Sequence, residues 1–227
     1  MATKYNLMSQ LVFKFPFKTK YYEQDYYVSS NNFSAYRLIE SWPNWPDKWV
    51  NIYGPKGCGK THLSNILKEK ISAAEILNAN NINEEKIMKF EKLDCLIIDN
   101  YENNIEENFF YSILNHFKQL DTYVVVNSHL PIKEMRLQLK DLKSRAESFV
   151  SLGVDLPTDD LLRVIISKYF SDKQIDISPK ISEYIIKNIE RSYEKVFKFI
   201  KEIDDLSLSS GKSININLIK KVLLHNE

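Results

Sequence analysis

The stretch Gly54-Pro55-Lys56-Gly57-Cys58-Gly59-Lys60-Thr61 decides the fold of this chain. It follows the pattern G-x-x-x-x-G-K-[S/T], whose glycines let the backbone curl until its N–H groups surround a phosphate. In this pattern Lys60 places a positive charge beside the β- and γ-phosphates, and the Thr61 hydroxyl is a ligand for Mg²⁺. The residues therefore predict a phosphate-binding loop (P-loop) that holds ADP or ATP with Mg²⁺. The candidate nucleotide-binding residues are Gly54, Pro55, Lys56, Gly57, Cys58, Gly59, Lys60, Thr61 and His62.

Strand and helix patterns alternate around this loop. Residues 49–53 read as a short strand before it, and residues 60–71 carry apolar side chains at helical spacing after it. Residues 93–99 and 123–127 are continuous apolar runs, as expected of strands buried on both faces. The alternation predicts an α/β fold, with a parallel sheet covered by helices on both faces. The other expected elements are helices at 34–40, 108–120 and 137–145 and strands at 75–78 and 149–152.

The pattern changes after the Leu156-Pro157 pair. Thr158 can cap a helix that runs to Phe170, and Ser178 followed by Pro179 predicts the start of another, which ends near residue 190. Helices are also expected at 193–206 and 215–224. Residues 21–156 are thus predicted to form the α/β nucleotide-binding domain and residues 157–227 a small all-helical lid domain, with residues 1–20 as an extended tail. The residues expected on the buried face of the helix at 193–206 are Val196, Phe197, Ile200 and Ile203.

Asp99 ends the buried apolar strand at 93–99. A carboxylate at this place can hold Mg²⁺ through water, so Asp99 is a candidate metal ligand together with Thr61, and a candidate catalytic residue. The next residue is Asn100, which cannot accept a proton from an attacking water as a carboxylate does. We therefore expect nucleotide binding to be intact and hydrolysis by the chain alone to be slow.

Composition restricts the location and the partners. Lys plus Arg number 31 and Asp plus Glu 30, a net charge of +1, so no overall charge favours nucleic acid or membrane as a partner. The two cysteines, Cys58 and Cys95, lack a metal-ligand spacing, and free thiols are typical of a reducing compartment. The first residues have no signal-peptide pattern and no apolar run has membrane-spanning length. These features predict a cytoplasmic protein.

Several motifs together carry a family resemblance. The P-loop continues into His62-Leu63, and a strand Leu96-Ile97-Ile98-Asp99-Asn100 follows later. Asp141-Leu142-Lys143-Ser144-Arg145 and the upstream Tyr26-Tyr27-Val28, with Asn32 and Ala35, complete the set. In these motifs and in its helical tail the chain resembles the AAA+ family, and within it the proteins related to the replication initiator DnaA. The resemblance covers about residue 15 to the end.

The resemblance implies a partner-dependent activity. Arg145 stands where the family has its arginine finger, a catalytic residue that reaches the γ-phosphate held by a neighbouring subunit. No sequence remains after the lid for the helix-turn-helix domain of DnaA, so direct sequence-specific DNA binding is not expected. The resemblance is therefore to the Hda type, which inactivates DnaA, inhibits replication initiation and shares the Asp-Asn pair. The resemblance implies DnaA and the sliding clamp as partners and no membrane partner. It is also compatible with a homo-oligomer of this chain.

The tail contains a candidate partner-binding motif. Gln10-Leu11-Val12-Phe13-Lys14-Phe15 is similar to the peptides that dock on the DNA polymerase sliding clamp. Gln10 would make the polar anchoring contacts, and Leu11, Phe13 and Phe15 would fill apolar clefts. The alternative is that the same apolar residues pack on the core of this chain.

Two positions depart from the family pattern. His129 stands where the family has an acid after its sensor-1 strand, which leaves Asn127 or Ser128 to face the γ-phosphate. Glu194 stands at the sensor-2 position, so either Arg191 replaces the sensor or the lid does not sense the nucleotide. Three alternatives stay open: an autonomous AAA+ ATPase of the helicase-loader type, an adaptor whose P-loop is structural only, and a binder of duplex DNA.

Overall fold

The computed structural model describes residues 22–90 and 92–225, which form two compact units divided between Leu156 and Pro157. The first unit is built on a five-stranded parallel sheet with the strand order β2-β3-β4-β1-β5. Because all strands are parallel, their carboxyl ends meet at one edge, where ligands bind in sheets of this kind. The strands are β1 (Trp49–Tyr53), β2 (Ala74–Asn78), β3 (Cys95–Tyr101), β4 (Tyr123–Ser128) and β5 (Val150–Gly153).

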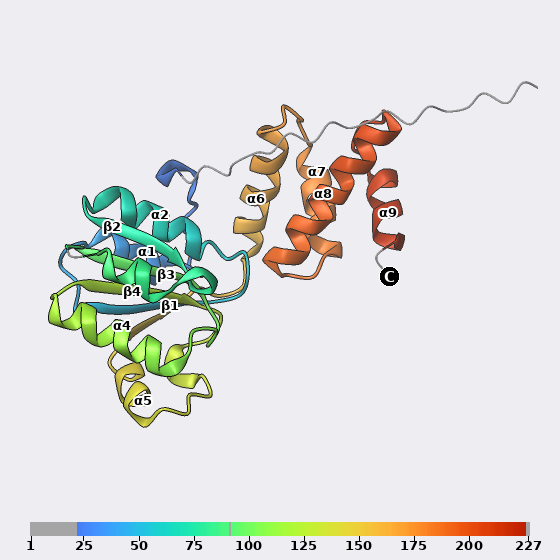
Figure 1. The fold of residues 1–227 in the computed structure, drawn as a ribbon. Helices are drawn as coiled ribbons and strands as arrows, with labels where there is room; N and C mark the ends of the chain where they lie inside the picture. Colours follow the sequence, from blue (N-terminus) through green and yellow to red (C-terminus); the bar gives the residue numbers. More distant parts are fainter. Residues whose placement is uncertain (1–21, 91, 226–227) are drawn as a thin grey trace, which may run out of the picture. The chain divides into compact units, whose positions relative to one another are not determined.

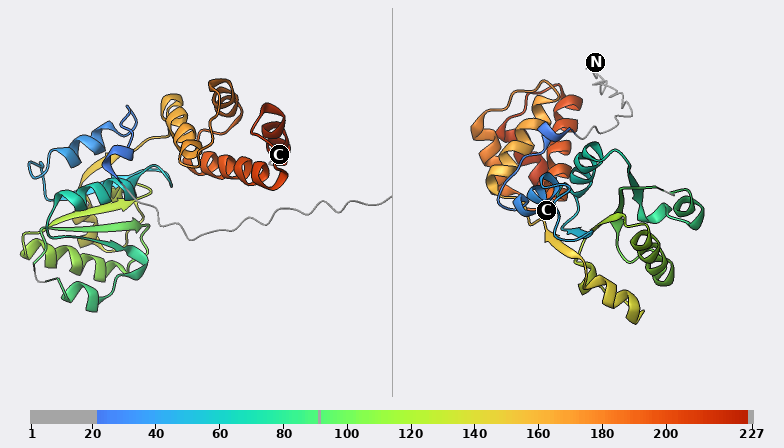
Figure 2. Two further views of the ribbon diagram at one scale, coloured as in Figure 1. Left: turned by 90° about the horizontal axis from the view of Figure 1, so that it is seen from above. Right: turned by 90° about the vertical axis from the view of Figure 1, so that its left-hand side faces the viewer.

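Helices cover both faces of this sheet. Helices α1 (Phe33–Glu40) and α2 (Lys60–Lys70) lie on one face and α4 (Glu107–Gln119) lies on the other (Figures 1 and 2). Alternate residues of a strand point to opposite faces, and both faces are buried, which is why β3 is apolar up to Ile98 and β4 up to Val126. The predicted α/β fold with helices on both faces is confirmed. The core beneath α4 includes Leu96, Ile98, Phe110, Leu114, Phe117, Val124 and Val126.

Helix α5 (Lys140–Ala146) begins three residues later than the periodicity predicts. The Glu107 carboxylate accepts hydrogen bonds from the backbone N–H groups of Gln138, at 2.8 and 2.9 Å, and Leu139, at 2.6 Å. These amides are held by α4 and take no part in a helical turn. The prediction of a helix over residues 137–145 is therefore wrong at its start, because a tertiary contact competes with the local pattern.

A few short elements were not predicted from the sequence. Helix α3 (Glu84–Met88) has five residues, too few to show a helical period, although Asn83 caps it by accepting the Lys86 N–H at 2.9 Å. The short 3₁₀ helices are likewise too short to show a helical period. They are η1 (Glu23–Asp25), η2 (Ala79–Asn81) and η3 (Ile132–Glu134).

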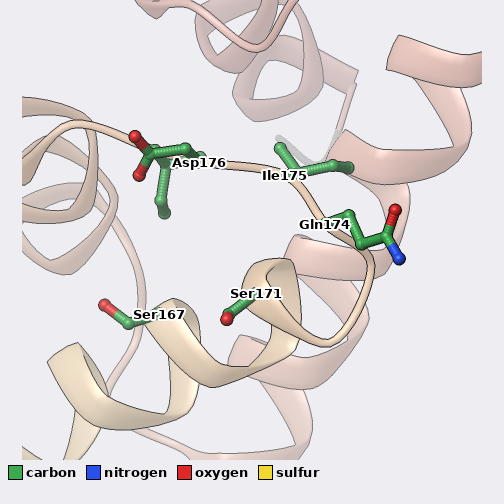
Figure 3. A pocket seen from close by; sticks show the side chains of 6 residues that line it. Ser167, Ser171, Gln174, Ile175 and Asp176 are labelled. Atoms are coloured by element: carbon green, nitrogen blue, oxygen red, sulfur yellow. The ribbon is translucent and has the colours of Figure 1, made fainter.

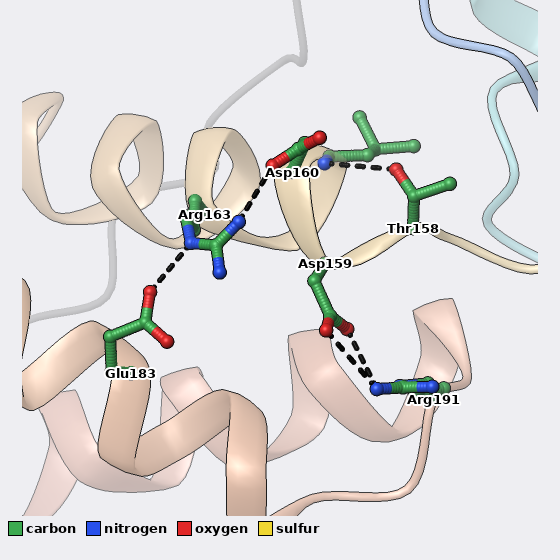
Figure 4. Close-up of polar contacts among 7 residues, drawn as sticks. Thr158, Asp159, Asp160, Arg163, Glu183 and Arg191 are labelled. Carbon is green, nitrogen blue, oxygen red and sulfur yellow. Dashed lines mark hydrogen bonds and ion pairs between the residues drawn. The ribbon is translucent and has the colours of Figure 1, made fainter.

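The second unit is helical, as predicted. The Thr158 hydroxyl accepts the Leu161 N–H at 3.3 Å and caps the first helix (Figure 4). Arg163 pairs with Asp160 of the same helix and with Glu183 of the second helix, both at 2.6 Å, and the second pair links the two helices. The Ser178 side chain makes no capping hydrogen bond with the described residues; its backbone oxygen accepts the Ile181 N–H instead. The helices are α6 (Asp159–Ser171), α7 (Pro179–Asn188), α8 (Tyr193–Ser210) and α9 (Ile216–His225).

The buried face of α8 differs from the prediction at one residue. Phe197 is 42% exposed, and Phe199 is buried in its place beside Val196 and Ile200. Phe199 lies three residues after Val196, on the same face of the helix, whereas Phe197 is rotated by one residue away from it. The helix also runs to Ser210, beyond the expected residue 206, and ends at Gly211 in the left-handed conformation.

Candidate nucleotide-binding site

The P-loop joins the carboxyl end of β1 to the first turn of α2. Gly59, the residue before α2, has a φ of 98°, and a Cβ atom there would lie 3.0 Å from Cε2 of Tyr26. A side chain at Gly54 would overlap the backbone oxygen of Val154, next to β5. Both glycines are therefore required by the local structure, and the curled backbone leads directly into the N-terminus of α2, where unpaired N–H groups favour an anion.

The Lys60 side chain turns back into the loop. Its ammonium donates to the backbone oxygens of Gly54, at 2.7 Å, and Pro55, at 3.0 Å, and lies 3.6 Å from the sulfur of Cys58. Cys58 is buried, and this burial raises the pKa of its thiol, while the Lys60 charge acts in the opposite direction. A phosphate bound in the loop would therefore meet the positive charge of Lys60 within the curl of the backbone.

Asp99 lies beside Thr61, although the two residues are far apart in the sequence. The Thr61 hydroxyl donates to one carboxylate oxygen of Asp99 at 2.8 Å, and the Asn127 amide donates to the other at 2.8 Å. The same amide contacts the Ser64 hydroxyl at 2.7 Å, so α2, β3 and β4 meet through four polar side chains. All of these residues except Thr61 are buried.

This group of side chains fits a nucleotide-bound Mg²⁺. Mg²⁺ prefers oxygen ligands and usually keeps several waters, and here a hydroxyl and a carboxylate lie together at the start of α2. The side-chain oxygen of Asn127 is buried without a hydrogen-bond partner among the residues that the structure describes. A buried carbonyl oxygen in this state can accept a hydrogen bond from water or from a ligand.

Asn100 lies just beyond Asp99 and is exposed. Its φ of 59° is left-handed, a conformation that asparagine adopts more readily than most residues, and the pairing of β3 with β4 is irregular between Ile98 and Tyr101. The strand therefore places a carboxamide, which is no general base, next to Asp99.

Arg145 lies at the opposite edge of the sheet from the P-loop. Its guanidinium donates to the side-chain oxygen of Asn115 at 3.1 Å and lies 5.6 Å from the ring centre of Trp49. Trp49 is the first of the five residues of β1, and the loop follows the last; at ~3.3 Å per residue the strand spans about 16 Å. The structure thus brings Thr61 and Asp99 together and keeps Arg145 away from them.

His62, a candidate nucleotide-binding residue, and the tryptophans before β1 have packing contacts. His62 contacts the backbone oxygen of Tyr22 at 2.7 Å through Nε2, and its ring meets Tyr26 edge-on. Trp42 and Trp45 pack on each other and on Tyr123, the first residue of β4. The two tryptophans therefore lie at the edge opposite the P-loop and do not line a base pocket there.

Three residues at positions that depart from the family pattern, His129, Arg191 and Glu194, can be placed in the structure. His129 follows β4 and is exposed. Arg191 pairs with both carboxylate oxygens of Asp159, at 3.0 and 3.1 Å (Figure 4), and Glu194 is exposed in the first turn of α8. The Arg191 guanidinium is therefore already engaged within the helical unit.

The helical unit also has a hollow of about 410 Å³ beside the end of α6 (Figure 3). Ser167 and Ser171 line it together with Gln174 and Asp176. Among the described residues that line it none is basic, and a carboxylate repels phosphate. The hollow is therefore not suited to a nucleotide.

The sequence of the whole chain is similar to that of a known initiator. DnaA, the chromosomal replication initiator protein of Buchnera aphidicola, is 25% identical to it in an alignment that covers 95% of this chain and 53% of that protein. No family model matches the chain.

The chain has the fold of the AAA+ domain of DnaA, to which it is similar in sequence over nearly its whole length.

Solved structures agree with this DnaA-related fold. Domain III of DnaA from Thermotoga maritima superposes with a TM-score of 0.73 at 17% identity, covering 93% of this chain and 98% of that one. AMPPCP-bound DnaA from Aquifex aeolicus gives 0.66 at 19% identity, covering 86% and 68%. A RuvB variant from Thermotoga maritima gives 0.67 at 20% identity, covering 88% and 70%. The chain spans about half the length of the Buchnera relative.

Some residues around the P-loop and Arg145 had no clear signal in the sequence. Ser64 and Asn115 are ordinary helical polar residues until the fold places them beside Asn127 and Arg145.

The tail motif, Gln10, Leu11, Phe13 and Phe15, lies outside the described residues. Within the described part of the chain, no helix has both the length and the apolar character needed to cross a membrane.

Proposed function

We propose that this DnaA-related protein is a nucleotide-dependent regulator of chromosomal replication initiation. In this proposal it binds ADP or ATP with Mg²⁺ in the P-loop, docks on the sliding clamp in the cytoplasm, and promotes ATP hydrolysis by DnaA. The observation that supports the proposal is that Arg145 lies far from the P-loop of its own chain. The phosphate-binding residues lie at one edge of the sheet and Arg145 lies at the other.

Each half serves a different nucleotide in this proposal. Lys60, Thr61 and Asp99 hold the nucleotide of this chain, and the bound Mg²⁺ would neutralise charge on its phosphates. Asn100 supplies no general base, so this nucleotide is hydrolysed slowly and acts mainly to stabilise the fold. Arg145 cannot reach it and instead stabilises the charge that develops on ATP bound to DnaA.

The tail would bring the two proteins together. Gln10, Leu11, Phe13 and Phe15 would anchor the chain to the clamp, and anchoring raises the effective concentration of Arg145 near DnaA. This part of the proposal rests on the sequence motif. A pull-down with the sliding clamp, comparing the intact chain with a variant in which Gln10 and Leu11 are both Ala, tests it by loss of clamp binding.

The main test is a measurement of ATP hydrolysis by DnaA in the presence of DNA-loaded clamp and this chain. Arg145→Ala is expected to reduce the stimulation by at least ~10³-fold, the lower end for an arginine finger supplied by a partner. Lys143→Ala, on an exposed residue of the same helix, is the matched control and should keep the stimulation. Both variants should bind ADP like the wild type.

The outcomes separate the proposal from its rival. Full stimulation by Arg145→Ala would exclude the proposed role of this residue. If the wild type hydrolyses ATP by itself at about 1 per second or more, an ordinary enzyme rate, the chain is an autonomous ATPase of the helicase-loader type.

A further inference from the structure

Arg145 lies in the wall of a cavity of about 340 Å³ at the amino edge of the sheet. The start of β1, the end of α4 and the end of α5 contribute its walls. Trp49, Lys118 and Arg145 are the lining residues that bear on its chemistry, together with the charged side chains of Lys48, Asp47 and Asp121.

Two of the three cations that line this cavity, Lys118 and Arg145, are available to bind a ligand. Lys48 pairs with the Asp121 carboxylate at 2.5 Å and also donates to the Asp121 backbone oxygen at 2.9 Å. The Asp47 carboxylate accepts the backbone N–H of Trp49 at 3.3 Å. Among the residues that the structure describes, no carboxylate forms an ion pair with Lys118 or Arg145. The lining holds three cations and two carboxylates, a net charge of +1, so on balance the cavity favours an anion.

Lys118 and Arg145 both line the cavity, and the position of Arg145 is fixed by its neighbours. Asn115 and Lys118 are three residues apart on α4, a spacing that puts both side chains on the same face of the helix. Asn115 fixes one nitrogen of the Arg145 guanidinium, and the Trp49 ring lies beneath it. Trp49 is itself 6% exposed and packs against Phe149, which makes it a rigid support.

We propose that this cavity is a phosphate site in which Lys118 acts as a second cation beside Arg145. Asn115 and Trp49 are its positioning residues. The ligand is the terminal phosphate of a nucleotide presented by a second protein, so this inference rests on the proposed function and adds a residue to it. A guanidinium and an ammonium suit one phosphate because the first binds in a plane and the second as a point charge.

Direct binding tests the cavity without any partner. Inorganic pyrophosphate is titrated, with ³¹P line broadening as the readout, into a Lys60→Ala variant whose P-loop no longer competes. We expect saturable binding that Lys118→Gln and Arg145→Gln each weaken at least fivefold. Lys133→Gln, an exposed lysine outside the cavity, should change nothing. Equal pyrophosphate affinity in all of these variants would overturn the proposal.

Stimulated hydrolysis then identifies the source of the phosphate. With DnaA as the partner, Lys118→Gln should lower the stimulated rate about tenfold and Asn115→Ala should lower it less, while both variants bind ADP normally. Loss of pyrophosphate binding with an unchanged hydrolysis rate would show that the cavity takes free phosphate only and would overturn the role assigned to Lys118. If the wild type fails to stimulate DnaA, the proposed function fails and the pyrophosphate titration still decides the cavity.

Discussion

Replacement of Gly59 by Ala tests how the P-loop is built. Gly59 has a φ of 98°, and the new Cβ atom would lie 3.0 Å from the Tyr26 ring. Tyr26 has little room to move because it stacks on Tyr36 and meets His62 edge-on, with ring centres 5.8 and 5.2 Å away. A side chain in such a sparsely populated conformation costs about 1–3 kcal/mol. The variant must either keep this strain or change the loop.

Both responses weaken nucleotide binding. A loop that relaxes to a negative φ turns its N–H groups away from the phosphate, and a loop that keeps its shape pushes Tyr26 against its neighbours. A loss of ~1.4 kcal/mol corresponds to tenfold weaker binding, so we expect the affinity for a fluorescent ADP analogue to fall at least tenfold. Thermal unfolding of the free protein gives the accompanying loss of stability.

Gly211→Ala is the matched control. Gly211 also has a left-handed φ, 62°, but a Cβ atom there would contact nothing within 4 Å, and the residue follows α8 in the helical unit. This variant should lose about 1 kcal/mol of stability and keep the wild-type affinity for ADP. Wild-type ADP affinity in Gly59→Ala would refute the reasoning, because it would mean that the loop does not need its observed backbone conformation.

Three further predictions concern other parts of the molecule. Asp99→Asn should leave ADP binding without Mg²⁺ within about threefold of the wild type and abolish most of the gain on adding Mg²⁺, because the carboxylate charge is lost; paired titrations with Mg²⁺ and with chelator measure this. Thr158→Ala should lower the free energy of unfolding of the helical unit by about 1 kcal/mol through loss of a helix cap, and urea unfolding with and without the substitution checks it. Hydrogen bonds from the amides of Leu139 and Gln138 lower the pKa of Glu107 below its ordinary value of 4.5. The stabilisation by the Glu107 carboxylate is therefore complete above pH 4.5 and is lost as the pH falls through the lowered pKa. Hydrogen exchange should show this as a loss of amide protection at the start of α5 in the wild type, and Glu107→Gln should show no such pH dependence.

The sequence predicts the sheet well because burial on both faces leaves a strong local signal. Most residues of β1, β3 and β4 are apolar, and the P-loop pattern fixes which strand precedes which helix. Asp99 could be chosen from the sequence because it ends such a strand. The carboxyl ends of parallel strands then bring it to Thr61, a contact of 2.8 Å that no local pattern encodes.

The sequence fails where a distant contact decides the local structure. Helix α5 starts late because Glu107 holds the amides before it, and no residue near the start of this helix signals that contact. The burial of Phe199 in place of Phe197 is a different case, because the three-residue spacing from Val196 already favours Phe199. Arg145 on α5 is supported by Trp49 on β1 and Asn115 on α4. The sequence motif predicts the arginine, but it does not predict these two contacts because they come from other elements.

The most direct test of the central claim is a calorimetric titration of the purified chain with ADP and with ATP, each in the presence of Mg²⁺. The account predicts saturable binding of one nucleotide per chain, weakened at least tenfold in Lys60→Ala, whose ammonium now contacts the oxygens of Gly54 and Pro55. Absence of binding up to ~1 mM nucleotide, equivalent to a binding free energy no stronger than about −4 kcal/mol, would contradict it.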